Sequence, residues 1–269
     1  TFSSAASDVY KRQALEIGQH IFYIEATDAT TGCLRLRPLS IDILKRDTVD
    51  IQLKMMAEGS YNNSDSQMNT HLANKNLLPL AQPFSDAPWN YAGTETLPNI
   101  PTNMVDWVLL EVRNANEKTE IIEKRAAILL NDGTIADVAN SNEAVKCYNL
   151  TAGDAYYVSI RMRNHLAIMS RQTMALPNSI TLDCSLPFNV DDGYNLLIDM
   201  TNGVYAIPAG DIDGNGMIDD NDILLYLLDA ASLNQYLSSD NDLDGNVTVK
   251  DLNLILKNKN ASAVIELRE

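Results

Sequence analysis

Two stretches near the end of the chain repeat one twelve-residue pattern of oxygen-bearing side chains. Residues 211–222 and residues 240–251 carry these side chains at positions one, three, five, nine and twelve, and each has a glycine, Gly216 or Gly245, at position six. A loop that wraps an ion needs such a sharp turn at its middle. The oxygen-bearing residues are Asp211, Asp213, Asn215, Asp219 and Asp222 in the first copy and Asp240, Asp242, Asp244, Thr248 and Asp251 in the second.

Calcium is the ion that this pattern suits best. It accepts about six to eight oxygen ligands in flexible geometry, whereas magnesium demands a tighter octahedron. The backbone carbonyls of Met217 and Asn246, at position seven, would complete the two sets, and the apolar residues at position eight, Ile218 and Val247, would tie the loops back to back. The alternative is a pair of metal-free acidic turns, but turns do not require this spacing twice. We therefore predict two Ca²⁺ sites.

A helix is expected after each loop, because apolar residues recur at helical spacing. The chain before the first loop, residues 204–210, is expected to be extended. The two apolar stripes are predicted to pack on each other; they comprise Ile223, Leu224, Leu227 and Leu228, and Leu252, Ile255 and Leu256.

This duplicated loop and exit helix, over residues 209–262, resembles the dockerin family. The resemblance implies a small calcium-dependent helical module, here residues 208–269, that binds a cohesin partner, with an intramolecular domain partner as the alternative. It also implies partner contacts at loop positions ten and eleven. Those positions hold Asp220 and Asn221 in the first copy and Val249 and Lys250 in the second.

The chain is acidic, with 269 residues, 45% hydrophobic residues and a formal net charge of −16. Residues 208–269 contribute half of that charge, since they hold twelve acidic and four basic residues. An acidic chain without a basic stripe argues against nucleic acid and anionic membrane surfaces as partners. No apolar run is long enough to predict a membrane span.

Three cysteines, Cys33, Cys147 and Cys184, cannot all pair within the chain, and their spacing fits no zinc site. A Cys147–Cys184 disulfide and three free buried thiols both remain open. The chain begins at Thr1, as expected of a fragment, and residues 1–13 are expected to be an artefact or a disordered leader.

Residues 14–44 predict a β-hairpin, because 20–28 and 33–37 alternate around a Thr-Thr-Gly turn. With Gly32 and Cys33 after the turn, this hairpin resembles the end of the immunoglobulin-like repeats of secreted bacterial proteins. It would then be the last hairpin of a truncated Ig-like domain.

Residues 45–207 predict a mostly β fold, an Ig-like or jelly-roll-type β-sandwich. Strands are expected at 49–56, 106–113, 125–130, 133–137, 156–162, 180–186 and 195–200, with a tight turn at 131–133. The alternating inward residues include Val49, Ile51, Leu53 and Met55 in the first strand, and Tyr156, Val158, Ile160 and Met162 in a later one.

The long loop at 59–101 contains one expected short helix at 68–76 and an aromatic cluster of Phe84, Trp89 and Tyr91 beside Asn90. The cluster could stack on a sugar ring. The alternative is that Pro88 and Trp89 plug the open end of the sandwich, since large aromatic side chains are usually buried.

Five short segments, 59–62, 78–80, 88–91, 105–113 and 163–170, precede the duplicated loops. Their order, across residues 45–262, resembles the C-terminal region of large surface proteins that Gram-negative bacteria secrete by the type IX route, some of them haemagglutinin-like. The resemblance implies an extracellular or outer cell-surface location.

No catalytic motif emerges around His20, His71 or His165. Arg161, Arg163 and His165 could together bind a carboxylate or a sugar acid. The alternative is a solvated or loop-covered sheet face beside Glu111 and Arg113. Glu111 and Asp106 lie five residues apart on one strand, hence on opposite faces, so they do not form a glycosidase pair.

We therefore expect a non-catalytic C-terminal region of a secreted or cell-surface bacterial protein, serving adhesion, display or assembly. The second hypothesis is an accessory carbohydrate-binding and dockerin tail of a polysaccharide-degrading or proteolytic enzyme. In that case a glycan would be a partner of the sandwich and the enzyme would lie upstream.

Overall fold

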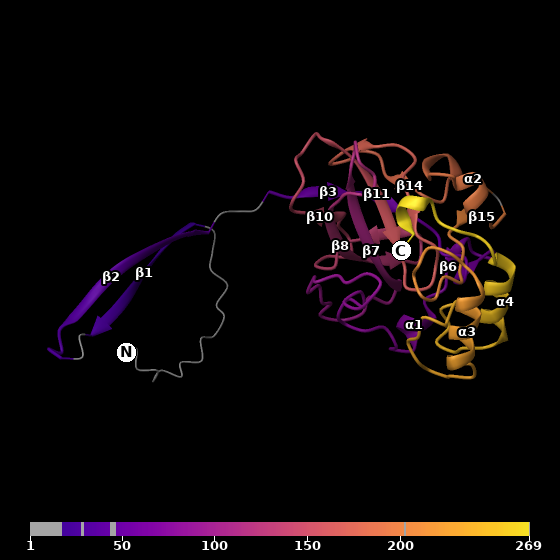
Figure 1. The fold of residues 1–269 in the computed structure, drawn as a ribbon, viewed down its shortest axis with the longest axis horizontal. Helices are drawn as coiled ribbons and strands as arrows, with labels where there is room; N and C mark the ends of the chain where they lie inside the picture. Colours follow the sequence, from indigo (N-terminus) through magenta and orange to yellow (C-terminus); the bar gives the residue numbers. More distant parts are fainter. Residues whose placement is uncertain (1–17, 28–29, 44–46, 202, 269) are drawn as a thin grey trace. The chain divides into compact units, whose positions relative to one another are not determined.

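The computed structural model describes residues 18–27, 30–43, 47–201 and 203–268 (Figure 1). The chain divides into two compact units, Thr1–Asp47 and Thr48–Glu269, each considered by itself. In the first unit, β1 (Gly18–Thr27) and β2 (Leu34–Ile43) form an antiparallel hairpin. The hairpin predicted within residues 14–44 is therefore present, whereas its origin in an Ig-like domain stays a prediction. The expected leader, residues 1–13, lies outside the described residues.

The second unit is built on one curled sheet of eight strands. Its long strands β7 (Met104–Asn114), β8 (Ile121–Leu130) and β11 (Ala155–Arg161) pair antiparallel in the order β11-β7-β8. Ten consecutive residues of β7 are buried, so both faces of the sheet are covered. The other strands of this sheet are β4 (Leu53–Lys54), β9 (Thr134–Ala136), β12 (Ile168–Met169), β13 (Met174–Ala175) and β14 (Leu182–Asp183).

Short elements complete the unit. The paired strands are β3 (Val49–Ile51) with β10 (Val145–Cys147), β5 (Tyr61–Asn62) with β6 (Gln67–Met68), and β15 (Ile198–Asp199) with β16 (Tyr205–Ala206). The helices are α1 (His71–Asn74), α2 (Gly193–Leu196), α3 (Asp220–Asp229) and α4 (Val249–Asn258), with 3₁₀ turns η1 (Pro187–Asn189) and η2 (Ile265–Leu267).

The prediction of a mostly β fold is confirmed. The residues predicted to face the core in two of the strands are also buried. All four residues of the row from Val49 to Met55 are buried, as are the four from Tyr156 to Met162. The turn between β8 and β9 is also where the Asn-Asp-Gly sequence predicts it, with Gly133 at φ +92°. Alternation identified these strands because one residue in two packs into the core.

Four predicted elements are shorter or broken. The strand at 49–56 divides at Gln52, because β3 pairs with β10 whereas β4 pairs with β9 and β14. The strands predicted at 180–186 and 195–200 shrink to β14 and β15. Asp192 adopts a left-handed φ of 55°, and α2 begins directly after it in place of a strand. The Asp192 carboxylate accepts a hydrogen bond from Asn195 Nδ2 at 2.7 Å. The helix predicted at 68–76 is the single turn α1.

Residues 208–269, predicted to be a separate module, belong to the same compact unit as the sheet. Ala209 forms a β-bridge with His165, and the Leu166 N–H donates to the carbonyl of Pro208 at 2.9 Å. Farther along, Lys257 Nζ lies 2.5 Å from Glu58 Oε1. These contacts join the end of the chain to the segments that follow β4 and β11.

Helices α3 and α4 follow the two loops as predicted, and they contact each other. Of the predicted stripe on α3, only Ile223 packs against the core. Leu224, Leu227 and Leu228 are 58–81% exposed, whereas Tyr226 is buried. The reason is local. The carboxylate of Asp222 turns into the loop, and the side chain four residues later, Tyr226, shares its face of the helix.

On α4 the same rule aligns Asp251 with Ile255, which is buried as predicted. Leu252 is half-buried and Leu256 is exposed, so the α4 stripe packs only in part.

Of the two alternatives for the cysteines, the Cys147–Cys184 disulfide is absent and all three thiols are free, although only two of them are buried. Cys147 and Cys184 are buried, whereas Cys33 is exposed. Burial raises the pKa of the Cys184 thiol to about 12, so this buried thiol is inert at neutral pH.

Among the described residues, none of the helices has the length and apolar character that crossing a membrane requires.

We predict that Trp107, a buried residue of β7, fastens the long loop 59–101 to the sheet. Trp107 is fully buried, and its Nε1 donates to the carbonyl of Pro79 at 2.9 Å. Trp107→Ala should lower the free energy of unfolding by about 3–5 kcal/mol. The control Leu80→Ala, at a side chain that is 47% exposed, should change it by less than about 0.5 kcal/mol. Urea denaturation measures both, and similar losses would contradict the prediction.

Candidate metal centre

The first loop gathers three carboxylates. Ligand oxygens of Asp211, Asp213 and Asp222 lie within 4.8 Å of one another. Asp211 is 2% exposed; its Oδ2 accepts from the Gly216 N–H at 3.1 Å, and its Oδ1 is buried without any hydrogen-bond partner. A buried carboxylate oxygen without a donor is costly. A cation at this position would remove that cost.

The second loop gathers Asp240, Asp242 and Asp244 within the same distance. Asp240 Oδ1 accepts from the Asp244 N–H at 3.0 Å, and Oδ2 accepts from the Gly245 N–H at 2.9 Å. Oδ2 also lies 3.8 Å from Arg163 Nη2. This loop is therefore already linked to a charged group of the sheet region.

The other predicted ligands cap helices or form hydrogen bonds within their own loops. Asp219 and Thr248 cap α3 and α4, and the residues three positions on, Asp222 and Asp251, complete the capping boxes. Asp251 accepts four hydrogen bonds and lies outside the second carboxylate cluster. Asn215 and Asn246 hydrogen-bond to the aspartate two residues before them, and Met217 is exposed. Their part in ion binding stays a prediction.

The glycines at position six turn the loops as predicted, with φ of +83° at Gly216 and +85° at Gly245. Both also allow close packing. A Cβ on Gly245 would lie 2.4 Å from Leu77 Cδ1, and a Cβ on Gly216 would lie 3.1 Å from Arg268 Cα. The loops therefore rest against the long loop 59–101 and the end of the chain, which the spacing of their ligands did not reveal.

The backbone groups of Ile218 and Val247 pair with other segments and not with each other, although both side chains are buried in the core. Ile218 exchanges backbone hydrogen bonds with residues 260 and 261, which follow α4, and Val247 does so with residues 231 and 232, which follow α3. Each loop is thus tied to the segment after the other loop's helix. Bridges from Met217 to Ser262 and from Leu233 to Asn246 repeat this exchange.

Crowding and burial shift the acidity of both clusters. Burial, and then the neighbouring carboxylates Asp222 and Asp213, raise the pKa of Asp211 well above its ordinary value. Burial raises the pKa of Asp222 to about 6, that of Asp240 to about 7 and that of Asp242 to about 6. Without a cation, these carboxylates therefore keep their protons at a higher pH than exposed aspartates do.

The basic residues near the second loop are covered, as the loop-covered alternative predicted. Arg161, Arg163 and His165 are at most 3% exposed, so they do not form an open site for a carboxylate or a sugar acid. Arg161 Nε lies 3.1 Å from Glu111 Oε1, and Arg163 Nε lies 2.9 Å from Asp106 Oδ2.

His165 is a structural link between the sheet and the second loop. Burial, and then the charge of Arg163, lower its pKa to about 3, so the imidazole is neutral. Its Nε2 accepts from the Gly59 N–H at 3.4 Å, and its Nδ1 lies 2.8 Å from Asn164 Oδ1. The Asn164 amide in turn donates to the carbonyl of Asp240 at 2.6 Å. The sequence singled out Arg163 and His165, but not their connection to residue 240.

The aromatic cluster is also inside the fold. Trp89 and Tyr91 are each 8% exposed, and Phe84 is fully buried with its ring edge-on to Trp89. A Cβ on Gly214 would lie 3.1 Å from Trp89 Cζ2, so the indole packs against the first loop. Asn90 is exposed. The cluster therefore cannot stack on a sugar, and the carbohydrate-binding hypothesis loses the residues on which it relied.

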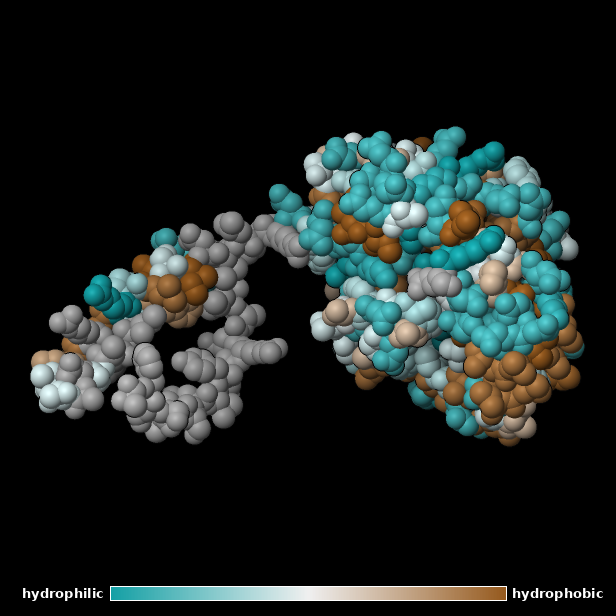
Figure 2. Space-filling view, in the orientation of Figure 1, coloured by the Kyte–Doolittle hydropathy of each residue, from teal (hydrophilic) through white to brown (hydrophobic). Residues whose placement is uncertain are grey.

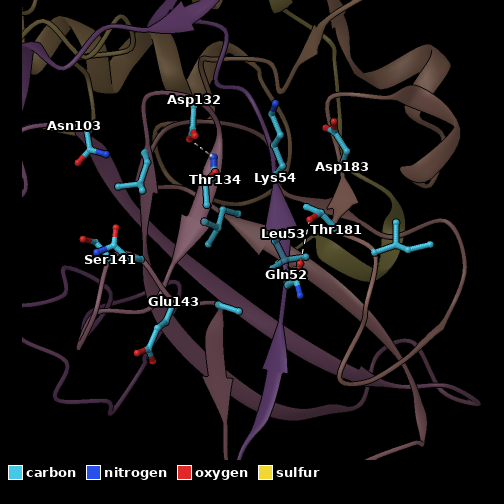
Figure 3. Close-up of a pocket in the computed structure, with 15 residues that line it drawn as sticks. Gln52, Leu53, Lys54, Asn103, Asp132, Thr134, Ser141, Glu143, Thr181 and Asp183 are labelled. Carbon is cyan, nitrogen blue, oxygen red and sulfur yellow. Dashed lines mark hydrogen bonds between the residues drawn. The ribbon is translucent and has the colours of Figure 1, made fainter.

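An open hollow of about 880 Å³ lies at the edge of the sheet formed by β9, β4 and β14 (Figure 3). Lys54, Asp132 and Asp183 project around it, and Asp132 accepts a hydrogen bond from the Thr134 N–H at 2.9 Å. The described residues that line it include no aromatic side chain. It offers polar contacts without a stacking surface.

The outer face of α3 and α4 is apolar and open. Figure 2 shows hydrophobic surface at the lower right of the second unit, where Figure 1 places these helices. The residues implied for partner contact, Asp220, Asn221, Val249 and Lys250, are exposed. The exposed apolar residues of α3 and α4 are Leu224, Leu227, Leu228, Val249 and Leu256.

Comparison with protein-family models found no match for this chain. Comparison with curated proteins found none either.

We predict that the metal-free protein loses stability as the pH rises from about 5 to about 7.5. The folded-state pKa values of Asp222, Asp240 and Asp242 lie above the value of about 3.9 expected in the unfolded chain. The folded state therefore holds more protons in this window, and stability falls as they leave. Melting in EDTA at both pH values measures the difference.

Asp240→Asn, which cannot titrate, should show a smaller difference between the two pH values. Calcium should raise the melting temperature more at about pH 7.5 than at about pH 5, because protons compete with the ion for the carboxylates. A melting temperature that rises with pH in EDTA would contradict the prediction.

Proposed function

We propose that this chain contains a non-catalytic, calcium-stabilised C-terminal region of a secreted or cell-surface bacterial protein, which serves adhesion, display or assembly. The observation that carries the proposal is the pair of matching carboxylate clusters, in one of which a buried Asp211 oxygen has no donor. In this proposal residues 208–269 are a dockerin-like module, and the curled sheet belongs to an Ig-like or jelly-roll-type sandwich.

The donor set fits calcium. It consists of aspartate oxygens, with carbonyls at position seven as further candidates, and hard cations of flexible coordination prefer such oxygens. A bound calcium ion would neutralise carboxylates that otherwise repel one another. The aspartates would hold the ion, and the capping boxes at Asp222 and Asp251 would join each loop to its helix.

The burial and pairing of Glu111 and His165 support a non-catalytic role. Glu111 is fully buried and accepts from Arg113 Nη2 at 2.5 Å and from Ser159 Oγ at 2.9 Å. Burial alone would raise its pKa, but Arg161 and Arg113 outweigh burial and lower it. Glu111 therefore stays charged and paired. His165 is neutral and holds backbone groups in place.

The open face of α3 supports a role in assembly. A contiguous group of exposed leucines on a small protein is typical of a surface that binds another protein. A cohesin-like domain is the partner that the dockerin resemblance implies. An extracellular location, which the type IX resemblance implies, would supply the calcium that weak extracellular sites require.

Calcium should stabilise the chain through both loops. At a free calcium concentration about a hundredfold above the dissociation constant, each site adds about 2.7 kcal/mol to the free energy of unfolding. Asp213→Asn and Asp242→Asn should each remove one site, whereas Asp65→Asn, at an exposed aspartate outside the loops, should remove none. Calorimetric titration and melting with calcium and then EDTA measure the effect.

Trp89 gives a second readout, because it packs against the first loop at Gly214. Its fluorescence should respond to calcium in Asp242→Asn but not in Asp213→Asn. If the complete chain shows neither heat of binding nor a shift in melting temperature with calcium, the proposal is wrong.

Assembly through α3 should depend on its leucines and on calcium. We expect the calcium-loaded chain to bind immobilised cohesin domains, and EDTA to abolish the binding. Leu228→Gln should weaken binding by roughly tenfold, because it removes apolar area from the contact. Leu80→Gln, at an exposed leucine outside this face, is the matched control. Binding that survives EDTA, or that Leu228→Gln leaves unchanged, would exclude this mode of assembly.

A further inference from the structure

The two loops share a pattern but differ in their surroundings. At position one of the first loop, Asp211 has a buried Oδ1 without a hydrogen-bond partner. At the matching position of the second loop, both oxygens of Asp240 accept backbone hydrogen bonds, and Arg163 Nη2 lies 3.8 Å from Oδ2. The second loop therefore already has a protein cation beside a proposed ligand.

Arg163 is held in that position by β7 and by the segment before the second loop. Its Nε donates to Asp106 Oδ2 at 2.9 Å, its Nη1 donates to the carbonyl of Leu237, and its guanidinium lies 4.3 Å from the ring centre of Tyr236. The Tyr236 hydroxyl donates to Asp106 Oδ1 at 2.7 Å. The side chain of Arg163 is 4% exposed, so its positive charge cannot swing away into solvent when an ion arrives.

The charges of the loops differ in the same direction. Residues 211–222 include five aspartates and no basic residue, whereas residues 240–251 include four aspartates and Lys250. Lys75 adds a further positive charge, since its Nζ donates to the carbonyl of Asp244 at 2.5 Å. Around the first loop, Arg161 lowers the pKa of Asp211 and lies 3.1 Å from Glu111 Oε1, and Lys259 pairs with Asp220 outside the carboxylate cluster.

We propose that Arg163 sets the affinity of the second loop for calcium, so that two loops of one pattern bind the ion unequally and the first loop fills first. The inference rests on the proposed calcium function. A fixed positive charge beside a ligand opposes a divalent cation, and the opposition is strong where water is excluded. The affinity of calcium loops follows the number of charges around the ion.

Calorimetric titration of the complete, EDTA-treated chain with calcium tests the proposal. We expect two classes of site: Asp213→Asn removes the tighter class and Asp242→Asn removes the weaker one. Arg163→Gln should tighten the weaker class by roughly tenfold and leave the tighter class unchanged. Arg125→Gln is the matched control, because Arg125 is a sheet arginine that pairs with Glu95, 3.0 Å away.

The outcomes separate the two proposals. If Arg163 had only a structural role, Arg163→Gln would lower the melting temperature without tightening the weaker class. That result, a single class of equal sites, or loss of the tighter class in Asp242→Asn would overturn the inference while calcium binding itself stood. No calcium binding in the unmodified chain would overturn the proposed function instead. If Arg163→Gln does not fold, the order of filling decides, and a second loop that fills first overturns the inference.

Discussion

Electrostatic repulsion among buried carboxylates is the constraint that shapes the end of this chain. Two loops each bring three aspartates within 4.8 Å, and burial removes the water that would screen them. Backbone N–H groups and Arg163 offset part of the cost in the second loop. In the first loop, one oxygen of Asp211 has no such compensation. This buried oxygen without a hydrogen-bond donor is the strongest physical reason to place a cation there.

The same loops are inseparable from the sheet-based fold. Gly59 can lie against the second loop only because it lacks a side chain, since a Cβ there would fall 1.8 Å from the carbonyl oxygen of Asn241. Trp89 covers the first loop, and a chain of hydrogen bonds through His165 and Asn164 reaches Asp240. An ion in either loop would therefore stabilise contacts well beyond its own ligands. Binding of such an ion and folding of the second unit would then be one linked equilibrium.

Local patterns in the sequence predicted the local structure well. Alternation located the buried rows of β3, β4 and β11, and the spacing of the oxygen side chains located both loops, their glycine turns and the start of α3 and α4. These features depend on residues a few positions apart. The clustering of Asp211, Asp213 and Asp222 follows from the same spacing.

Long-range packing was harder to predict. Periodicity identifies the apolar face of a helix or strand, but it does not identify the segment against which that face packs. The leucines of α3 have helical spacing, yet Asp222 turns Tyr226 inward and leaves them outside. The cover over Arg163 comes from residues more than seventy positions away, and the cover over Trp89 comes from more than a hundred. No local pattern records such pairings, so the aromatic cluster was open to interpretation as a sugar platform.

The crossed backbone hydrogen bonds of the two loops make each half of the tandem depend on the other. Ile218 bonds to the segment after α4, and Val247 bonds to the segment after α3, so each half supplies backbone partners to the loop of the other. A single half would lack the segment that closes its own loop. These hydrogen bonds therefore form only when both halves are present, which makes the tandem one cooperative unit.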